Sequence, residues 1–116
     1  MDHAMQQDWR PRSDDEMAAA LNKSLDALPL LKDKDKLINR AQFFAALGDE
    51  TRLKIIGILR VHDCCLCELV AGLNIPSSTL KHHLQFLERG GVVRSRKEKK
   101  YTIFSLAPDQ NLDAYL

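Results

Sequence analysis

The chain has 116 residues, of which 45% are hydrophobic and 28% charged, and its formal net charge is +1. This length fits one domain plus an extension, and the composition allows a packed core and excludes a wholly disordered chain. No apolar run approaches the roughly 18 residues of a membrane-spanning helix, and the start lacks the apolar segment of a secretory signal, so we expect a cytoplasmic protein without a membrane partner.

The N-terminal part of the chain predicts a disordered start, residues 1–12, followed by one amphipathic helix. Ser13 and Glu16 have the spacing of a capping box, in which each side chain bonds the backbone amide of the other residue. The apolar residues that follow recur every three or four positions, as on one face of a helix: Met17, Leu21, Leu25 and Leu28. The pattern predicts a helix over about residues 14–28 that Pro29 ends.

Three further helices are predicted in the middle of the chain. The first covers about residues 33–47 and is closed by Gly48, which suits the left-handed position after a helix. Asp49 suits the N-cap of the second. The apolar residues of this second helix predict a wide buried side: Leu53, Ile55, Ile56, Ile58 and Leu59. Asp63 suits the N-cap of a short third helix over about residues 64–72.

The second half of the chain predicts a helix followed by a β-hairpin. Pro76 pre-sets the first turn of a helix that ends near Arg89, before two glycines. The remaining elements are, in order, a strand at residues 92–94, a charged turn at 96–100, a strand at 101–106 and a short helix at 109–116. Two short helices joined by a turn form a helix-turn-helix, and the hairpin adds a wing. We therefore predict a mainly α fold with a small β-hairpin (α+β), a winged helix-turn-helix.

A basic segment covers the second helix of this motif and the hairpin. Residues 72–106 hold seven basic and two acidic residues, and this net charge of +5 indicates a polyanionic partner such as double-stranded DNA. The second helix of the motif enters the major groove, with its N-terminal residues nearest the bases. The candidate DNA contacts on this helix are Ser77, Ser78, Thr79, Lys81, His82 and Gln85. Those on the hairpin are Arg94, Arg96, Lys97, Lys99 and Lys100. His83 is predicted to lean toward the core.

The three cysteines of the chain, Cys64, Cys65 and Cys67, lie within four positions. In a reducing cytosol such a cluster indicates metal binding or redox chemistry rather than a disulfide framework. At about 100° per residue, Cys65 and Cys67 lie roughly 160° apart on a regular helix, whereas Cys64 and Cys67 lie about 60° apart. Cys65 and Cys67 can therefore share one ion only if the helix start is distorted or Cys65 lies outside it.

Soft thiolates favour a thiophilic effector ion: As(III) or Sb(III) first, with Cd, Pb or Cu(I) as alternatives. No organic cofactor is expected. A helix N-terminus is expected to lower the thiol pKa. Two other interpretations stay open, namely a thiol-redox sensor and three small residues that only pack in the core. An enzyme is not predicted, because no glycine-rich nucleotide loop accompanies the thiols, and a helical protein–protein adaptor is the remaining rival.

From about residue 43 to residue 106 the chain resembles the ArsR/SmtB family of metal-sensing repressors. The matching stretches are residues 47–56, 74–84 and 88–93. Lys81 and Pro76 depart from the residues common in the family at their positions. The resemblance implies a winged-helix homodimer that occupies double-stranded operator DNA and leaves it when an effector binds. It also implies that Cys65 and Cys67 are effector ligands and that the first and last helices build the dimer interface.

These observations together predict four segments and one function. The segments are a disordered start at 1–12, a dimerisation helix at 13–32, the DNA-binding domain at 33–106 and a short C-terminal helix at 107–116 that is a further dimer contact. The predicted function is an operator-binding repressor that is released when a thiophilic ion binds Cys64, Cys65 and Cys67. The alternatives are a redox-sensing repressor of the same fold and one that responds to Cd, Pb or Cu(I).

Overall fold

The computed structural model describes residues 8–108 and 111–116, in two compact units that divide between Leu37 and Ile38. Residues 1–7 of the predicted disordered start and residues 109–110 of the predicted last helix lie outside the described residues. In the described chain, no helix is long and apolar enough to cross a membrane.

The first unit consists of α1 (Asp14–Ala27) and the 3₁₀ turn η2 (Pro29–Lys32). The predicted capping box is confirmed: Ser13 Oγ accepts from the Glu16 amide at 3.1 Å, and Glu16 Oε1 accepts from the Ser13 amide at 3.0 Å. No residue of α1 is buried. The helix forms with the predicted apolar face, but this face is not covered: Met17 and Leu21 are 52% and 66% exposed.

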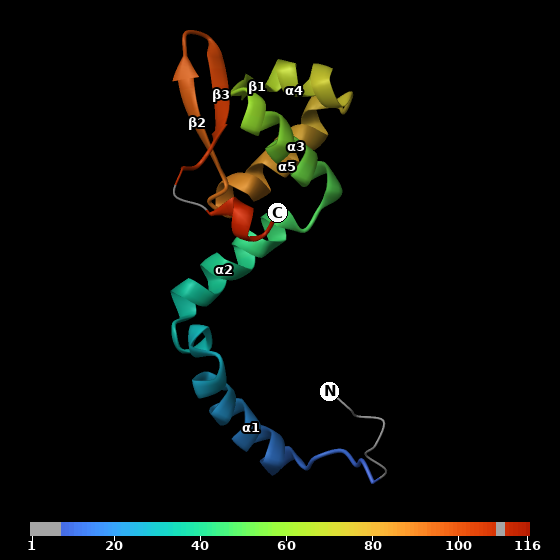
Figure 1. Ribbon diagram of the computed structural model, residues 1–116, viewed down its shortest axis with the longest axis vertical. Coiled ribbons are helices and arrows are strands. Elements are labelled where there is room, and N and C mark those ends of the chain that lie inside the picture. Colours follow the sequence, from blue (N-terminus) through green and yellow to red (C-terminus); the bar gives the residue numbers. More distant parts are fainter. Residues whose placement is uncertain (1–7, 109–110) are drawn as a thin grey trace. The chain divides into compact units, whose positions relative to one another are not determined.

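The second unit is built from helices around one core. Its helices are the larger part of α2 (Lys34–Leu47), α3 (Glu50–Val61), α4 (Leu66–Leu73) and α5 (Ser77–Arg89), shown in Figure 1. Asp49 caps α3 as predicted, because its Oδ2 accepts from the Arg52 amide at 3.1 Å. The core contains Ile55 and Ile56 of α3 together with the apolar face of α5, as predicted, while Leu53 is 40% exposed.

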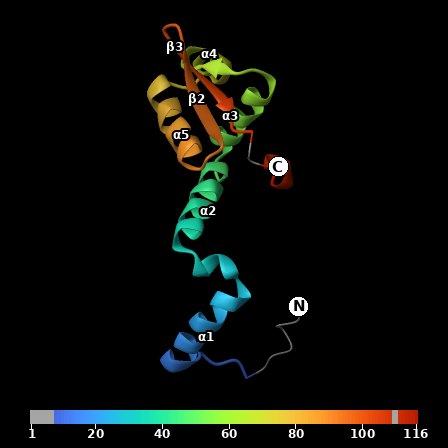
Figure 2. The same ribbon diagram turned by 90° about the vertical axis from the view of Figure 1, so that its left-hand side faces the viewer.

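The wing is a hairpin that is longer than predicted. Strands β2 (Val93–Glu98) and β3 (Tyr101–Leu106) pair antiparallel, so the turn shrinks from residues 96–100 to Lys99 and Lys100 (Figure 2). Lys99 takes the left-handed backbone conformation (φ 55°) that this tight turn needs. The prediction of an early strand end was wrong because charged side chains do not stop a strand whose side chains face water.

A third strand is a feature that the sequence analysis missed. Cys64–Cys65 form β1, which pairs antiparallel with β3 in the order β1-β3-β2, with Cys64 opposite Phe104 and Cys65 opposite Ile103. The prediction that residue 64 starts a helix was therefore wrong, since α4 begins at Leu66. The prediction that Asp63 caps it was wrong too, because the free amide of Cys65 donates instead to Glu68 Oε1 at 3.0 Å.

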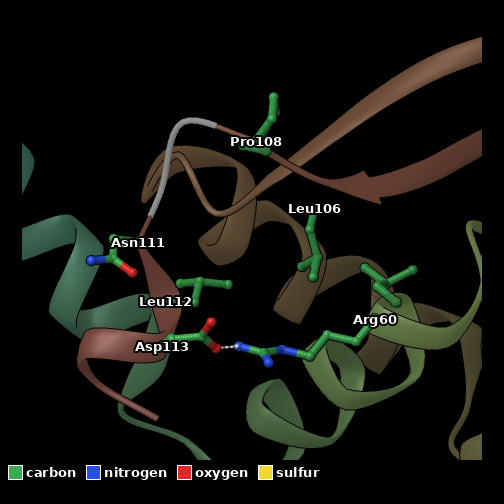
Figure 3. A pocket seen from close by; sticks show the side chains of 8 residues that line it. Arg60, Leu106, Pro108, Asn111, Leu112 and Asp113 are labelled. Atoms are coloured by element: carbon green, nitrogen blue, oxygen red, sulfur yellow. Dashed lines mark hydrogen bonds and ion pairs between the residues drawn. The ribbon is translucent and has the colours of Figure 1, made fainter.

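The C-terminal segment is shorter in regular structure than predicted. Within residues 111–116 the only helical element is the 3₁₀ turn η3 (Leu112–Ala114), not a full helix. Leu112 is buried beside α3, and Asp113 Oδ1 accepts from Arg60 Nη2 at 2.7 Å across a hollow of about 460 Å³ (Figure 3). This ion pair fastens the end of the chain to α3.

Candidate functional site

The exposed face of α5 carries every residue predicted to contact DNA on this helix. The helix presents two faces, of which the inner one buries Leu80, Leu84 and Leu87 in the core. The outer face exposes Ser77, Ser78, Thr79, Lys81, His82 and Gln85. Pro76 is the N-cap rather than the first helical residue, and its carbonyl accepts from the Leu80 amide at 3.1 Å. The small hydroxyl residues therefore form the first turn of the helix, where an approaching DNA backbone meets free amides.

The wing exposes all five predicted basic residues: Arg94, Arg96, Lys97, Lys99 and Lys100. Arg96 differs from the others, because its Nη1 donates to Asp63 Oδ2 at 2.9 Å and its Nε donates to Glu98 Oε1 at 3.1 Å. These hydrogen bonds, that of Asp63 first, raise the pKa of Arg96. Arg96, one of the five wing residues predicted to contact DNA, is thus held by two carboxylates in the free protein. One of them, Asp63, lies directly before the cysteines in the sequence.

A partly buried network fastens α5 to α3 and to the end of α2. Arg52 donates to the carbonyl oxygens of Ala46 and Ala45, at 3.0 Å each, and its Nη1 lies 3.0 Å from His83 Nδ1. The same guanidinium lies 4.5 Å from the ring centre of Phe86. The predicted inward, structural role of His83 is confirmed. Sequence reasoning missed Arg52, since an arginine in the first turn of a helix carries no signal of such contacts.

The structure brings two of the three cysteines together. The Sγ atoms of Cys65 and Cys67 lie 2.6 Å apart. Cys65 belongs to β1 and precedes α4, so the 160° separation expected on a regular helix does not arise. The condition that Cys65 lies outside the helix is met.

Cys64 faces away from this sulfur pair. Neighbouring side chains of a strand point to opposite faces, and Cys64 lies in the hydrophobic core with its Sγ donating to the His62 carbonyl at 3.3 Å. The prediction that Cys64 and Cys67 face the same way was wrong, because Cys64 is not helical. Among the residues that the structure describes, no three His, Cys, Asp or Glu side chains are gathered as a metal site.

The surroundings of Cys64 and Cys67 raise the pKa of both thiols. Burial, followed by the negative charge of Glu68, raises the pKa of Cys64. The hydrogen bond with Cys65, followed by desolvation, raises the pKa of Cys67. The expected lowering by a helix N-terminus was wrong, since the shared hydrogen bond and the desolvation outweigh it here.

Comparison with known proteins agrees with this architecture. The sequence profile of the bacterial regulatory proteins of the arsR family matches residues 49–95. An uncharacterised HTH-type transcriptional regulator of Methanocaldococcus jannaschii is 34% identical over 66% of this chain and 86% of its own length. The arsenical resistance operon repressor of Escherichia coli is 34% identical, and the match covers 58% of each chain.

Among solved structures, a homodimeric winged helix-turn-helix domain from Mycobacterium bovis, a possible ArsR-family regulator, has a TM-score of 0.60 and covers 87% of this chain and 78% of its own. Its identity of 21% makes it a likeness of fold alone. The helix-turn-helix, the wing and the relatives lead to one assignment: the chain belongs to the ArsR family of bacterial transcriptional regulators.

Proposed function

We propose that this chain is a homodimeric repressor that binds operator DNA through α5 and the wing and leaves it when a thiophilic ion binds Cys65 and Cys67. The observation that carries the sensing part is the pair of sulfur atoms 2.6 Å apart where β1 meets α4. Bonds from a soft ion to sulfur are about 2.3 Å long, so the two sulfur atoms must move somewhat farther apart to share one ion. The exposed side chain of Cys67 can do so by rotation.

The DNA-binding part of the proposal rests on exposure and charge. The exposed hydroxyl and cationic side chains of α5 and the wing belong to the segment 72–106, which carries a net charge of +5. The groups on α5 suit base edges and phosphates, and the wing cations suit the adjacent backbone. We assign residues 33–106 to this DNA-binding domain.

Arsenite or antimonite is the effector that the site favours. The raised pKa of Cys67 disfavours the thiolate form that Cd, Pb and Cu(I) require, whereas As(III) hydroxide reacts with neutral thiols. The relatives include both an arsenical repressor and cadmium resistance regulators, so the choice rests on the thiol chemistry. Cys64, the third predicted ligand, would join only if β1 turned its sulfur out of the core.

The position of the sulfur pair suggests how the signal reaches DNA. Cys65 pairs with Ile103 of the wing, and Cys67 lies in the first turn of α4, which packs against α5. An ion that fixes both sulfurs favours one arrangement of β1 and α4, and only this difference in affinity shifts the equilibrium away from the DNA-bound form. A coupling of about 1–3 kcal/mol weakens DNA binding by about 5- to 150-fold.

The dimer is proposed from the apolar face of α1. A stripe that includes Met17, Leu21 and Leu28, each more than half exposed, needs a partner to bury it. We assign residues 13–32 to dimerisation with a second copy, and residues 107–116 to a further contact. The Mycobacterium bovis domain, which shares the fold, is homodimeric.

The test is release of DNA by arsenite in single cysteine variants. Cys65→Ser and Cys67→Ser should bind DNA like the wild type and lose release by arsenite, while Cys64→Ser, the matched control, should keep it. Normal release from both Cys65→Ser and Cys67→Ser would refute the site. Release by peroxide without any ion would instead establish the redox alternative.

A further inference from the structure

A cavity of about 580 Å³ opens beside the sulfur pair. Its walls come from α4, the first turn of α5 and the wing strand β3. The cysteines 65 and 67 lie at one side, and the apolar part of the wall is formed by Leu66, Val70, Tyr101 and Phe104. An enclosed apolar cavity of about 150 Å³ holds a benzene ring, so this larger, open hollow accepts a group of that size.

The number of sulfur atoms facing the cavity limits its occupant. Cys65 and Cys67 line the wall, whereas the Cys64 sulfur is engaged with the His62 carbonyl. Trivalent arsenic forms three bonds, and two thiols leave its third position unfilled by protein. An arsenical with one organic substituent has two exchangeable positions and one carbon bond, which matches two thiols beside an apolar wall.

We propose that the cavity is the seat of the organic substituent of a trivalent monosubstituted organoarsenical, with arsenic bound to Cys65 and Cys67. This inference rests on the proposed function, because it names the class of effector for the same sulfur pair. In the binding step, R–As(OH)₂ reacts with two thiols to give R–As(S-Cys)₂ and two molecules of water. Two As–O and two S–H bonds break, two As–S and two O–H bonds form, and arsenic stays trivalent.

The occupied cavity also reaches the predicted DNA face. Ser77 and Lys81 of α5 and Lys100 of the wing turn are exposed members of its wall and are predicted DNA contacts. A substituent seated there lies between the helix and the wing that are expected to hold one stretch of DNA. The organic group would therefore block DNA directly, in addition to the change in β1 and α4 that sulfur binding causes.

The test measures how arsenite, methylarsonous acid and phenylarsine oxide distribute between the reduced full-length protein and dithiothreitol. Intact-protein mass spectrometry counts the bound arsenical, and the small dithiol cancels the intrinsic affinity of each compound for sulfur. Relative to dithiothreitol, the wild type should prefer the phenyl over the methyl compound by about 10- to 100-fold, as expected for burial of an aromatic ring.

A matched pair of variants on α4 locates the effect. Val70→Phe places a ring in the cavity beside the sulfur pair and should reduce the phenyl preference, while Ala71→Phe, at the exposed neighbouring position outside the wall, should keep it. Circular dichroism checks that both variants fold. If either variant does not fold, the comparison of the phenyl and methyl compounds in the wild type still tests the proposal.

The outcomes separate the two proposals. Equal distribution of the phenyl and methyl compounds in the wild type would overturn the cavity assignment, while arsenite binding that requires Cys65 and Cys67 would still uphold the proposed function. Failure of arsenite and both organic compounds to bind these cysteines would overturn both. A phenyl preference that is undiminished in Val70→Phe would place the ring elsewhere and overturn the cavity assignment.

Discussion

Removing the Asp63 carboxylate should tighten DNA binding, because it frees Arg96 of the wing. In the free protein this guanidinium donates to Asp63 at 2.9 Å and to Glu98 at 3.1 Å. A DNA phosphate that takes Arg96 must first displace these carboxylates. The prediction tests whether all the wing residues contribute equally to DNA binding, or whether Arg96 contributes less because it must first leave its carboxylate partners.

The expected magnitude follows from the exposure of the pair. Arg96 and Asp63 side chains are each 46% exposed, and ion pairs near the surface contribute about 0–1 kcal/mol. Asp63→Asn should therefore tighten binding by up to about fivefold. Each phosphate contact that is lost lowers the salt slope of the binding constant by about 0.9. Arg96→Ala should lower it by less than Lys97→Ala or Lys100→Ala, since Arg96 gives up two partners to bind.

The assay is fluorescence anisotropy of a labelled DNA duplex, between about 50 and 200 mM salt where the electrostatic contribution is large. Glu50→Gln is the control of matched charge, because Glu50 pairs with Lys54 at 3.5 Å on α3, away from the wing. The reasoning is refuted if Asp63→Asn binds no tighter than Glu50→Gln, or if Arg96→Ala costs as much as the lysine variants.

Four further predictions concern stability and assembly. Asp49→Ala should lower the free energy of unfolding in urea by about 1 kcal/mol, as for other N-cap residues. The hydrogen bond from the Arg52 amide lowers the pKa of Asp49. The wild type should therefore be more stable than Asp49→Asn above the ordinary pKa of 3.8, and this difference should vanish as the pH falls through the lower pKa of the folded state. A stability difference that does not change with pH would contradict this. Leu69→Ala, at a fully buried core position, should cost about 2–5 kcal/mol in the same unfolding assay, and a cost below about 1 kcal/mol would contradict the packing of α4. Leu21→Asp, at a position 66% exposed on α1, should leave the secondary structure by circular dichroism unchanged and shift the protein from dimer to monomer in sedimentation velocity; an unshifted dimer would place the interface elsewhere.

Much of the fold follows from interactions between residues close in the chain. The capping box at Ser13 and the N-cap at Asp49 predict where α1 and α3 begin, because such caps satisfy free amides within one turn. The spacing of Leu80, Leu84 and Leu87 predicts the buried face of α5, and the alternation in residues 101–106 predicts β3 with its correct bounds. The basic wing and the exposed face of α5 follow from the same patterns.

The cysteine site depended on contacts between distant segments. A helix start and a two-residue strand look alike at Cys64–Cys65, and the pairing with Phe104 and Ile103 decides between them. That pairing takes Cys65 out of the helix and brings its sulfur to Cys67, and it turns Cys64 into the core.

The charged contacts of the site also join residues that are distant in the sequence. The partners of Arg96 and Arg52 include Asp63 and His83, which lie far along the chain from them. A sequence determines caps, turns and buried faces through short-range hydrogen bonds and periodic burial. Which side chains then meet across elements depends on strand register and helix packing, and these exist only once the chain has folded.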